Sequence, residues 1–147
     1  MNRSRSKKVV FRLEQDADGY PPATTESVWA NEVGEGRYQL DNIPFFTREA
    51  TLGDVVHARA EDGELVFAGI ARRSSNSLIR VVYFDPTDPQ DVRDELEKLG
   101  CATEWMEDFD LIAVNVPDSV PLADVQKALE AGSTAGRWDY EEAILRG

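Results

Sequence analysis

The apolar residues of this chain change their spacing close to residue 78, and that change limits the folds available to it. Before this point, short apolar runs alternate with polar residues between turn signals, and no helical period appears. After it, two segments start with proline, end with glycine and place apolar residues at one helical face. The sequence therefore predicts strands alone in the first half, and strands mixed with helices in the second.

Residues 8–77 are expected to form five or six short strands. Asp62-Gly63 is the strongest hairpin signal, and it joins predicted strands at 54–60 and 64–72. A series of short strands without a helix implies a small β-barrel or a rolled sheet. Most of the aromatic residues of this half are expected to pack in its core: Trp29, Tyr38, Phe45, Phe46 and Phe67.

Residues 78–147 predict the order β-α-β-β-α-β, which is that of ferredoxin-like domains. The first helix is expected over 89–99, with Asp88 as its N-cap and Gly100 as its end. The second is expected over 121–131, ended by Gly132. We therefore expect an α+β protein in which a small N-terminal β-barrel-like half packs on a C-terminal ferredoxin-like half. Neither piece of about 70 residues would be very stable alone.

The composition is that of a globular protein. Hydrophobic residues make up 41% of the 147 residues, and no stretch approaches the roughly 20 apolar residues that span a bilayer. Residues 1–7 are polar and basic, and we expect a disordered tail without the apolar segment of a secretory signal. A single cysteine excludes an intramolecular disulfide. We expect a cytoplasmic protein that does not bind membranes.

The charge is strongly acidic and unevenly distributed. The chain has 16 basic and 28 acidic side chains, for a net charge of −12. Residues 1–84 carry 11 basic and 12 acidic side chains, whereas residues 85–147 carry 5 and 16. Such a field repels nucleic acid and attracts basic partners, although an acidic surface also simply favours solubility. We expect no nucleic-acid partner.

Four acidic residues crowd the turn before the predicted strand at 111–116: Glu104, Glu107, Asp108 and Asp110. Like charges at this density repel one another unless solvent or a basic partner compensates them. One interpretation is a solvated hairpin tip, and the other is a docking site for a basic protein.

The segment that joins the two predicted halves is a candidate for anion binding. Arg72 and Arg73 supply guanidinium groups, and Ser75 and Asn76 supply hydroxyl and amide donors. The glycines of a phosphate-binding loop are absent, and turn formation alone explains these polar residues. The loop at Asp85–Pro89, between the first strand and helix of the second half, is the other place for a small ligand.

No catalytic group of residues appears. His57 is the sole histidine, lies in a predicted strand and has no nucleophile motif beside it. Cys101 follows a helix C-terminus near acidic residues, so we expect an inert buried thiol. Asp85, Asp88 and Asp91 are better explained by helix capping than by a metal site. We expect a protein that is not an enzyme and that binds no metal or cofactor.

Several sequence blocks resemble a bacterial family described only as a domain of unknown function, DUF4265. They include Asn42-Ile43-Pro44-Phe45-Phe46, Leu52-Gly53-Asp54-Val55-Val56 and Leu78-Ile79-Arg80-Val81-Val82. The resemblance runs from about Lys8 onward and is densest in the first half. It implies no activity, catalytic residue or cofactor, but small bacterial proteins of this kind are sometimes immunity proteins for secreted toxins.

These observations favour a non-catalytic binding protein whose acidic second half docks a basic partner protein. An immunity protein that blocks a basic toxin is the sharpest form of this hypothesis, because complementary charge speeds selective capture. The alternative is a small-molecule sensor that binds an anionic ligand near Arg72–Ser77 or at the Asp85–Pro89 loop.

Overall fold

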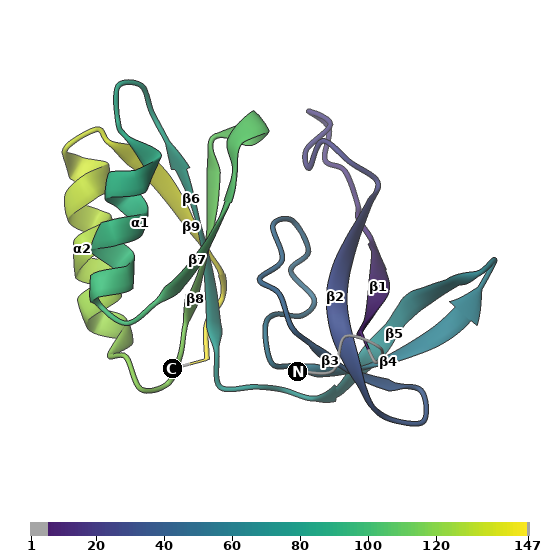
Figure 1. Ribbon diagram of the computed structural model, residues 1–147. Coiled ribbons are helices and arrows are strands. Elements are labelled where there is room, and N and C mark those ends of the chain that lie inside the picture. Colours follow the sequence, from purple (N-terminus) through teal and green to yellow (C-terminus); the bar gives the residue numbers. More distant parts are fainter. Residues whose placement is uncertain (1–5, 147) are drawn as a thin grey trace. The chain divides into compact units, whose positions relative to one another are not determined.

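The computed structural model describes residues 6–146 and divides the chain into two compact units, one ending at Ser74 and one beginning at Ser75. Both are rich in strands, and the second also contains two helices, so the protein is of mixed α+β type (Figure 1). Most of the expected basic tail, residues 1–5, lies outside the described residues. Ser6 and Lys7 belong to the first strand, so the prediction of a tail reaching residue 7 is wrong for these two residues.

The first unit consists of five strands that pair in sequence order. Each strand is antiparallel to the next, and the first and last pair in parallel, so that the sheet closes on itself. The strands are β1 (Ser6–Arg12), β2 (Thr25–Gly34), β3 (Arg37–Leu40), β4 (Val55–Glu61) and β5 (Glu64–Arg72).

The closure of this unit is short, because only Val9 with Leu65 and Val10 with Val66 join β1 to β5. The expected barrel is therefore better described as a ring of strands closed at one point. The predicted hairpin is confirmed: Asp62 and Gly63 link β4 to β5 with φ angles of 52° and 81°, as a type I′ turn requires. Buried residues of the ring form its core, namely Val9, Phe11, Val28, Ala30, Tyr38, Leu40, Ala50 and Val56.

Three of the five aromatic residues expected in this core depart from it: Phe45 and Phe46 are only partly buried and do not belong to the core cluster, and Trp29 is exposed. Trp29 is 37% exposed, and the ammonium group of Lys8 lies 5.0 Å from the centre of its ring. Trp29 and Lys8 are cross-strand partners of β2 and β1, so their side chains share one face of the sheet. The strand places Trp29 outward because its neighbours Val28 and Ala30 point into the core.

The second unit follows the expected element order along the chain. Its sheet has the strand order β7-β8-β6-β9 with antiparallel pairing throughout, and both helices lie on one side of it (Figure 1). Within residues 6–146, no helix is long and apolar enough to cross a membrane. The elements are β6 (Ser77–Tyr83), α1 (Pro89–Lys98), β7 (Ala102–Met106), the 3-10 helix η2 (Glu107–Phe109), β8 (Leu111–Val116), α2 (Leu122–Thr134) and β9 (Trp138–Ile144).

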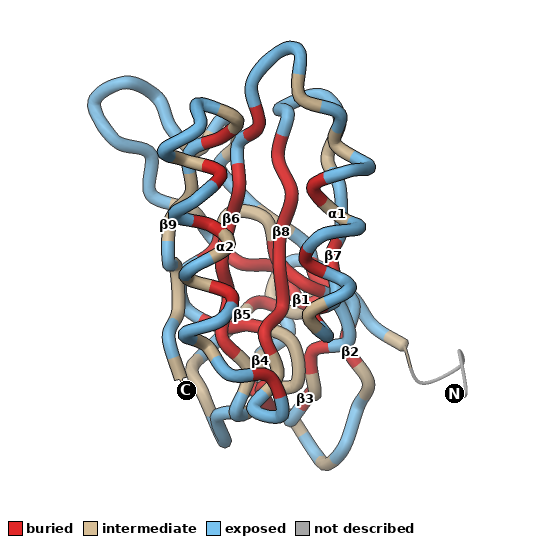
Figure 2. The backbone as a smooth tube through the Cα atoms, turned by 90° about the vertical axis from the view of Figure 1, so that its left-hand side faces the viewer, coloured by how far each residue is buried: buried red, intermediate tan, exposed pale blue. Residues whose placement is uncertain are grey.

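The predicted signals of the first helix are confirmed. The Asp88 carboxylate accepts the Gln90 N–H at 2.9 Å as N-cap of α1. Gly100, with φ of 104°, ends the helix, and its N–H and that of Cys101 bond back to Glu97 and Leu96. The inner sides of both helices and the strands β6 and β8 are buried, while the outer helix surfaces are exposed (Figure 2).

The predicted end of the second helix at Gly132 is wrong. The helix continues to Thr134, and Gly136, with φ of 74°, follows its C-cap. Gly132 is instead required for packing, since a Cβ there would lie closer than 3.0 Å to the Trp138 ring. Trp138 is 1% exposed and donates its indole N–H to the Leu129 carbonyl at 2.9 Å. A glycine inside a helix can thus mark close packing as well as an end.

Candidate functional site

The acidic turn predicted from the sequence joins β7 to β8, is exposed to solvent and contains a regular hydrogen-bonded turn. Glu107–Phe109 forms one turn of 3-10 helix, and Asp110 then adopts the left-handed conformation with φ of 50°. The Asp110 N–H closes the turn on the Glu107 carbonyl at 3.1 Å. We call the segment from Glu104 to Asp110 the acidic hairpin.

A buried tyrosine of β6 anchors the acidic hairpin. The Trp105 indole N–H donates to the Tyr83 hydroxyl oxygen at 2.8 Å, and the Tyr83 N–H donates to the Asp110 carbonyl at 3.1 Å. Burial raises the pKa of Tyr83, and so do the nearby Asp110 and Glu107 carboxylates, whereas the bond from Trp105 lowers it. The turn is therefore fixed to the sheet by the Asp110 backbone and by the Trp105 side chain.

Large apolar side chains are exposed at the same end of the second unit. Trp105 is 39% exposed and Phe109 is 45% exposed, both within the acidic hairpin. Phe84, which directly follows Tyr83, is 39% exposed. Aromatic residues beside charged ones are typical of protein-binding surfaces, because they supply a large contact area at little cost in side-chain entropy.

The structure brings only part of the predicted acidic group together. Glu107 and Asp110 both act on Tyr83, and Asp108 lies exposed between them. Glu104 precedes Trp105 in β7 and is exposed, and side chains of consecutive strand residues point to opposite faces. Glu104 thus lies on the opposite face of β7 from Trp105.

The candidate anion-binding segment straddles the boundary between the two units. Arg72 and Arg73 are exposed at the end of β5, and Ser75 is exposed just after the boundary. The Asn115 side-chain amide donates a hydrogen bond to the Asn76 side-chain oxygen at 3.4 Å, and both residues belong to the second unit. The polar groups of this segment are therefore partly engaged in local structure.

The loop at Asp85–Pro89 is also occupied by local contacts. The Thr87 hydroxyl donates to the Arg137 carbonyl at 3.1 Å, and Asp88 caps α1. His57 is exposed on β4, and Cys101 is buried with a pKa raised to about 11 by that burial. Among residues 6–146, no group of three histidine, cysteine or acidic side chains is placed to hold a metal ion.

Comparison with known proteins identifies the family. The model of the family described as "Domain of unknown function (DUF4265)" matches residues 26–140. The chain belongs to this DUF4265 family. A solved structure described as a "hypothetical protein from Neisseria gonorrhoeae" superposes with a TM-score of 0.82, at 23% identity, over 97% of this chain and 96% of the other. That similarity supports the fold alone. No curated protein matches the sequence.

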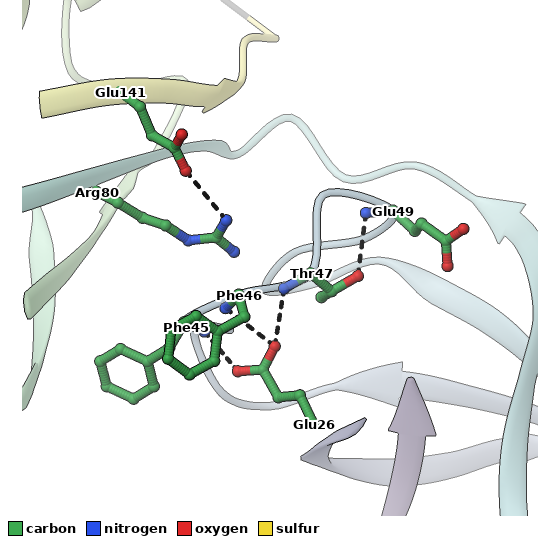
Figure 3. Close-up of polar contacts among 7 residues, drawn as sticks. All are labelled: Glu26, Phe45, Phe46, Thr47, Glu49, Arg80 and Glu141. Atoms are coloured by element: carbon green, nitrogen blue, oxygen red, sulfur yellow. Dashed lines mark hydrogen bonds and ion pairs between the residues drawn. The ribbon is translucent and has the colours of Figure 1, made fainter. Parts of the chain in front are cut away.

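The resemblance to DUF4265 rested in part on the block Asn42–Phe46, and the structure gives this block a definite role. The Glu26 carboxylate accepts three consecutive backbone N–H groups, from Phe45 at 2.6 Å, Phe46 at 3.1 Å and Thr47 at 2.9 Å (Figure 3). The Thr47 hydroxyl in turn accepts the Glu49 N–H at 3.2 Å. Glu26 therefore holds this loop of the DUF4265 chain, and sequence reasoning did not single it out.

Two further charged residues were also missed because they lie inside apolar blocks. Asp54 is fully buried, and its carboxylate accepts the Thr51 N–H at 2.9 Å and the Ser74 N–H at 2.8 Å. Arg80 is 3% exposed and lies 3.4 Å from the carboxylate of Glu141, its cross-strand partner on β9 (Figure 3). Each of these charged residues stands within a run of apolar residues in the sequence. That pattern could have predicted a buried charge with a partner, because buried charges require partners.

Proposed function

We propose that this DUF4265 protein is a non-catalytic binding protein whose acidic hairpin docks a basic partner protein. The observation that supports this most is the combination at one hairpin of exposed Trp105 and Phe109 with Glu107 and Asp108. Aromatic side chains supply contact energy, and carboxylates select a cationic partner. The bonds from the Trp105 indole to the Tyr83 hydroxyl and from the Tyr83 N–H to the Asp110 carbonyl organise this surface before binding, which lowers the entropy cost of association.

The charge of the second unit supports the same proposal. Residues 75–147 carry 6 basic and 16 acidic side chains, so the hairpin lies on a unit with a net charge of −10. A field of this size steers a basic partner toward the surface and accelerates its encounter. An immunity protein that neutralises a basic secreted toxin in the cytoplasm would use this chemistry. We also infer that the second unit is ferredoxin-like, and its strand order and antiparallel pairing support this.

The test is affinity capture from the native cell, followed by binding kinetics with whatever basic protein is recovered. The doubly reversed variant Glu107→Lys with Asp108→Lys should lose that protein, and it should keep its folded far-ultraviolet circular dichroism spectrum. The matched control reverses Glu35 and Asp41, which are exposed in the first unit, and so changes net charge equally. The control should retain the partner.

Salt dependence provides the second part of this test. Raising salt from about 0.05 to 0.5 M should slow association severalfold and change dissociation less, because screening acts mainly on encounter. If the recovered protein binds the reversed variant and the control equally well, the acidic hairpin is not the docking surface.

The alternative function is an anion sensor that uses Arg72 and Arg73. Both guanidinium groups are exposed, which favours their availability to a ligand. The double variant Arg72→Ala with Arg73→Ala distinguishes the two proposals. It should leave docking of the basic protein unchanged, and it should abolish binding of an anionic ligand if the sensor alternative is correct.

A further inference from the structure

The sheet of the second unit has two edge strands, and one of them, β7, leads into the acidic hairpin. Within residues 6–146, β7 pairs only with β8, and β9 pairs only with β6. The register of β9 is irregular opposite Leu78 and Ile79, and such an irregularity hinders pairing with a further strand. The register of β7 with β8 is continuous over all of its residues, Ala102–Met106. β7 is therefore the better template for an added strand.

The pairing within the sheet determines which backbone groups of β7 face β8. The Tyr83 N–H donates to the Asp110 carbonyl, so the backbone groups of Asp110 face β6. Consecutive residues of an antiparallel strand direct these groups to opposite sides, and those of Leu111 therefore face β7. Leu111 is the cross-strand partner of Met106. The N–H and carbonyl groups of β7 thus face β8 at Met106 and at every second residue before it.

The residues between them, Thr103 and Trp105, direct their backbone groups away from the sheet. The Arg93 guanidinium reaches the Thr103 carbonyl at 3.5 Å, which agrees with this direction. Within residues 6–146, no hydrogen bond is formed by the outward N–H and carbonyl of Trp105. A residue of another extended chain can therefore form two backbone hydrogen bonds with Trp105.

The side chains at this edge explain what an added strand could contact. Trp105 is 39% exposed on one face of β7, and Glu104 is exposed on the opposite face. A partner that covered one face of the sheet would contact only one of these two side chains. A strand added to the edge directs its own side chains alternately to both faces, so it can contact both of them.

Given the docking function proposed above, on which this inference rests, we propose that the basic partner adds an extended segment to the free edge of β7. Backbone groups of the segment pair with Trp105 and with the Thr103 N–H. A basic side chain of the segment lies beside Glu104, and an apolar side chain packs on the Trp105 ring. The segment therefore alternates basic with apolar residues. A second copy of β7 is disfavoured as occupant, because it would bring another Glu104 and another acidic hairpin to the same edge.

The experiment titrates the full chain, labelled with ¹⁵N, with a short peptide of alternating lysine and valine that is blocked at both ends. Saturable shifts are expected at the amides of Thr103 and Trp105, and hydrogen exchange of the Trp105 N–H should slow on binding. Replacing the central valine of the peptide with proline keeps its charge but removes an N–H and disfavours a strand. This peptide should bind about tenfold more weakly.

Variants of the protein test the role of Glu104. Glu104→Lys should weaken binding of the lysine–valine peptide about tenfold, because it places like charges side by side on adjacent strands. Glu35→Lys makes the same change of charge at an exposed position of the first unit and is the matched control. The control should bind the peptide nearly as well as the native chain.

The outcomes separate this mode of binding from the docking function itself. Equal binding of the proline peptide, with unchanged exchange of the Trp105 N–H, would show an electrostatic contact only and would overturn strand addition while docking of a basic partner stands. The absence of saturable binding by the lysine–valine peptide would also overturn strand addition. Equal binding of a peptide of alternating glutamate and valine would contradict both, since neither admits an acidic partner.

Discussion

Gly132 packs so closely against Trp138 that its replacement by alanine should have an unusual effect on stability. In an ordinary helix, Gly→Ala stabilises by about 1 kcal/mol because alanine loses less backbone entropy on folding. Gly132 lies within α2, but a Cβ there would overlap the Cζ2 and Cε2 atoms of Trp138. The ring cannot yield easily, since it is buried and its N–H is bonded to Leu129.

The expected cost of Gly132→Ala follows from these contacts. Overpacking a dense core costs about 3 kcal/mol at the upper end of its usual range, and loss of the Trp138 hydrogen bond adds about 1 kcal/mol. The gain in helix propensity offsets about 1 kcal/mol of this sum. We therefore expect a net destabilisation of about 3 kcal/mol. With a urea slope of about 2 kcal/mol/M, the unfolding midpoint should fall by about 1.5 M.

A double-mutant cycle isolates the contact. In a Trp138→Leu background, which removes the ring, Gly132→Ala should be neutral or stabilising by up to about 1 kcal/mol. Gly136→Ala is the control, since nothing lies within 4 Å of its Cβ position and only its positive φ opposes alanine. Urea unfolding followed by circular dichroism measures all variants. An equal cost of Gly132→Ala in both backgrounds would refute the reasoning, because the loss would then not depend on Trp138.

Three other outcomes are expected. Glu26→Gln should destabilise the protein by about 2 kcal/mol in urea unfolding, because a neutral amide replaces a carboxylate that accepts three N–H groups, whereas Glu35→Gln should change stability little. The raised pKa of the Cys101 thiol contributes stability that is present below pH 9.0 and is lost as the pH rises toward 11. The free energy of unfolding of the native protein, relative to that of Cys101→Ala, should therefore fall over that interval. A thiol reagent at pH 8 should modify Cys101 only when the protein unfolds. Duplex DNA and RNA should not bind with a submicromolar dissociation constant at 0.15 M salt, as measured by fluorescence anisotropy, because the acidic field opposes phosphate contacts.

Local signals in the sequence predicted the elements of the second unit well. Asp88 and Gly100 bracket α1 as expected, because a side-chain cap and a left-handed glycine act within a few residues of the helix. The Asp62-Gly63 turn was equally clear, since its two positive φ angles favour these residue types. Gly132 misled the prediction because its role depends on Trp138, which follows the helix and returns to pack on it.

The candidate site was predictable in its charge and not in its organisation. The acidic turn is predicted by the close spacing along the sequence of Glu107, Asp108 and Asp110. Nothing local to them indicates that Tyr83 binds Asp110 and Trp105 together, because Tyr83 precedes Trp105 by 22 residues along the chain. Glu26 was missed for the same reason, since its N–H partners lie about 20 residues away along the chain.

The backbone anchoring of Asp110 explains how the acidic hairpin can fold in the absence of the basic partner that we propose. Carboxylates crowded into one turn repel one another, and this repulsion opposes folding of the turn in the free protein. Donation from the Tyr83 N–H to the Asp110 carbonyl fixes the backbone of the turn, while the Glu107 and Asp108 side chains are exposed to solvent. Binding of the proposed basic partner would relieve the repulsion that remains, and this relief would add to the driving force for association. A hairpin that is fixed to its sheet and whose carboxylates repel one another can thus fold alone and still favour the proposed cationic partner.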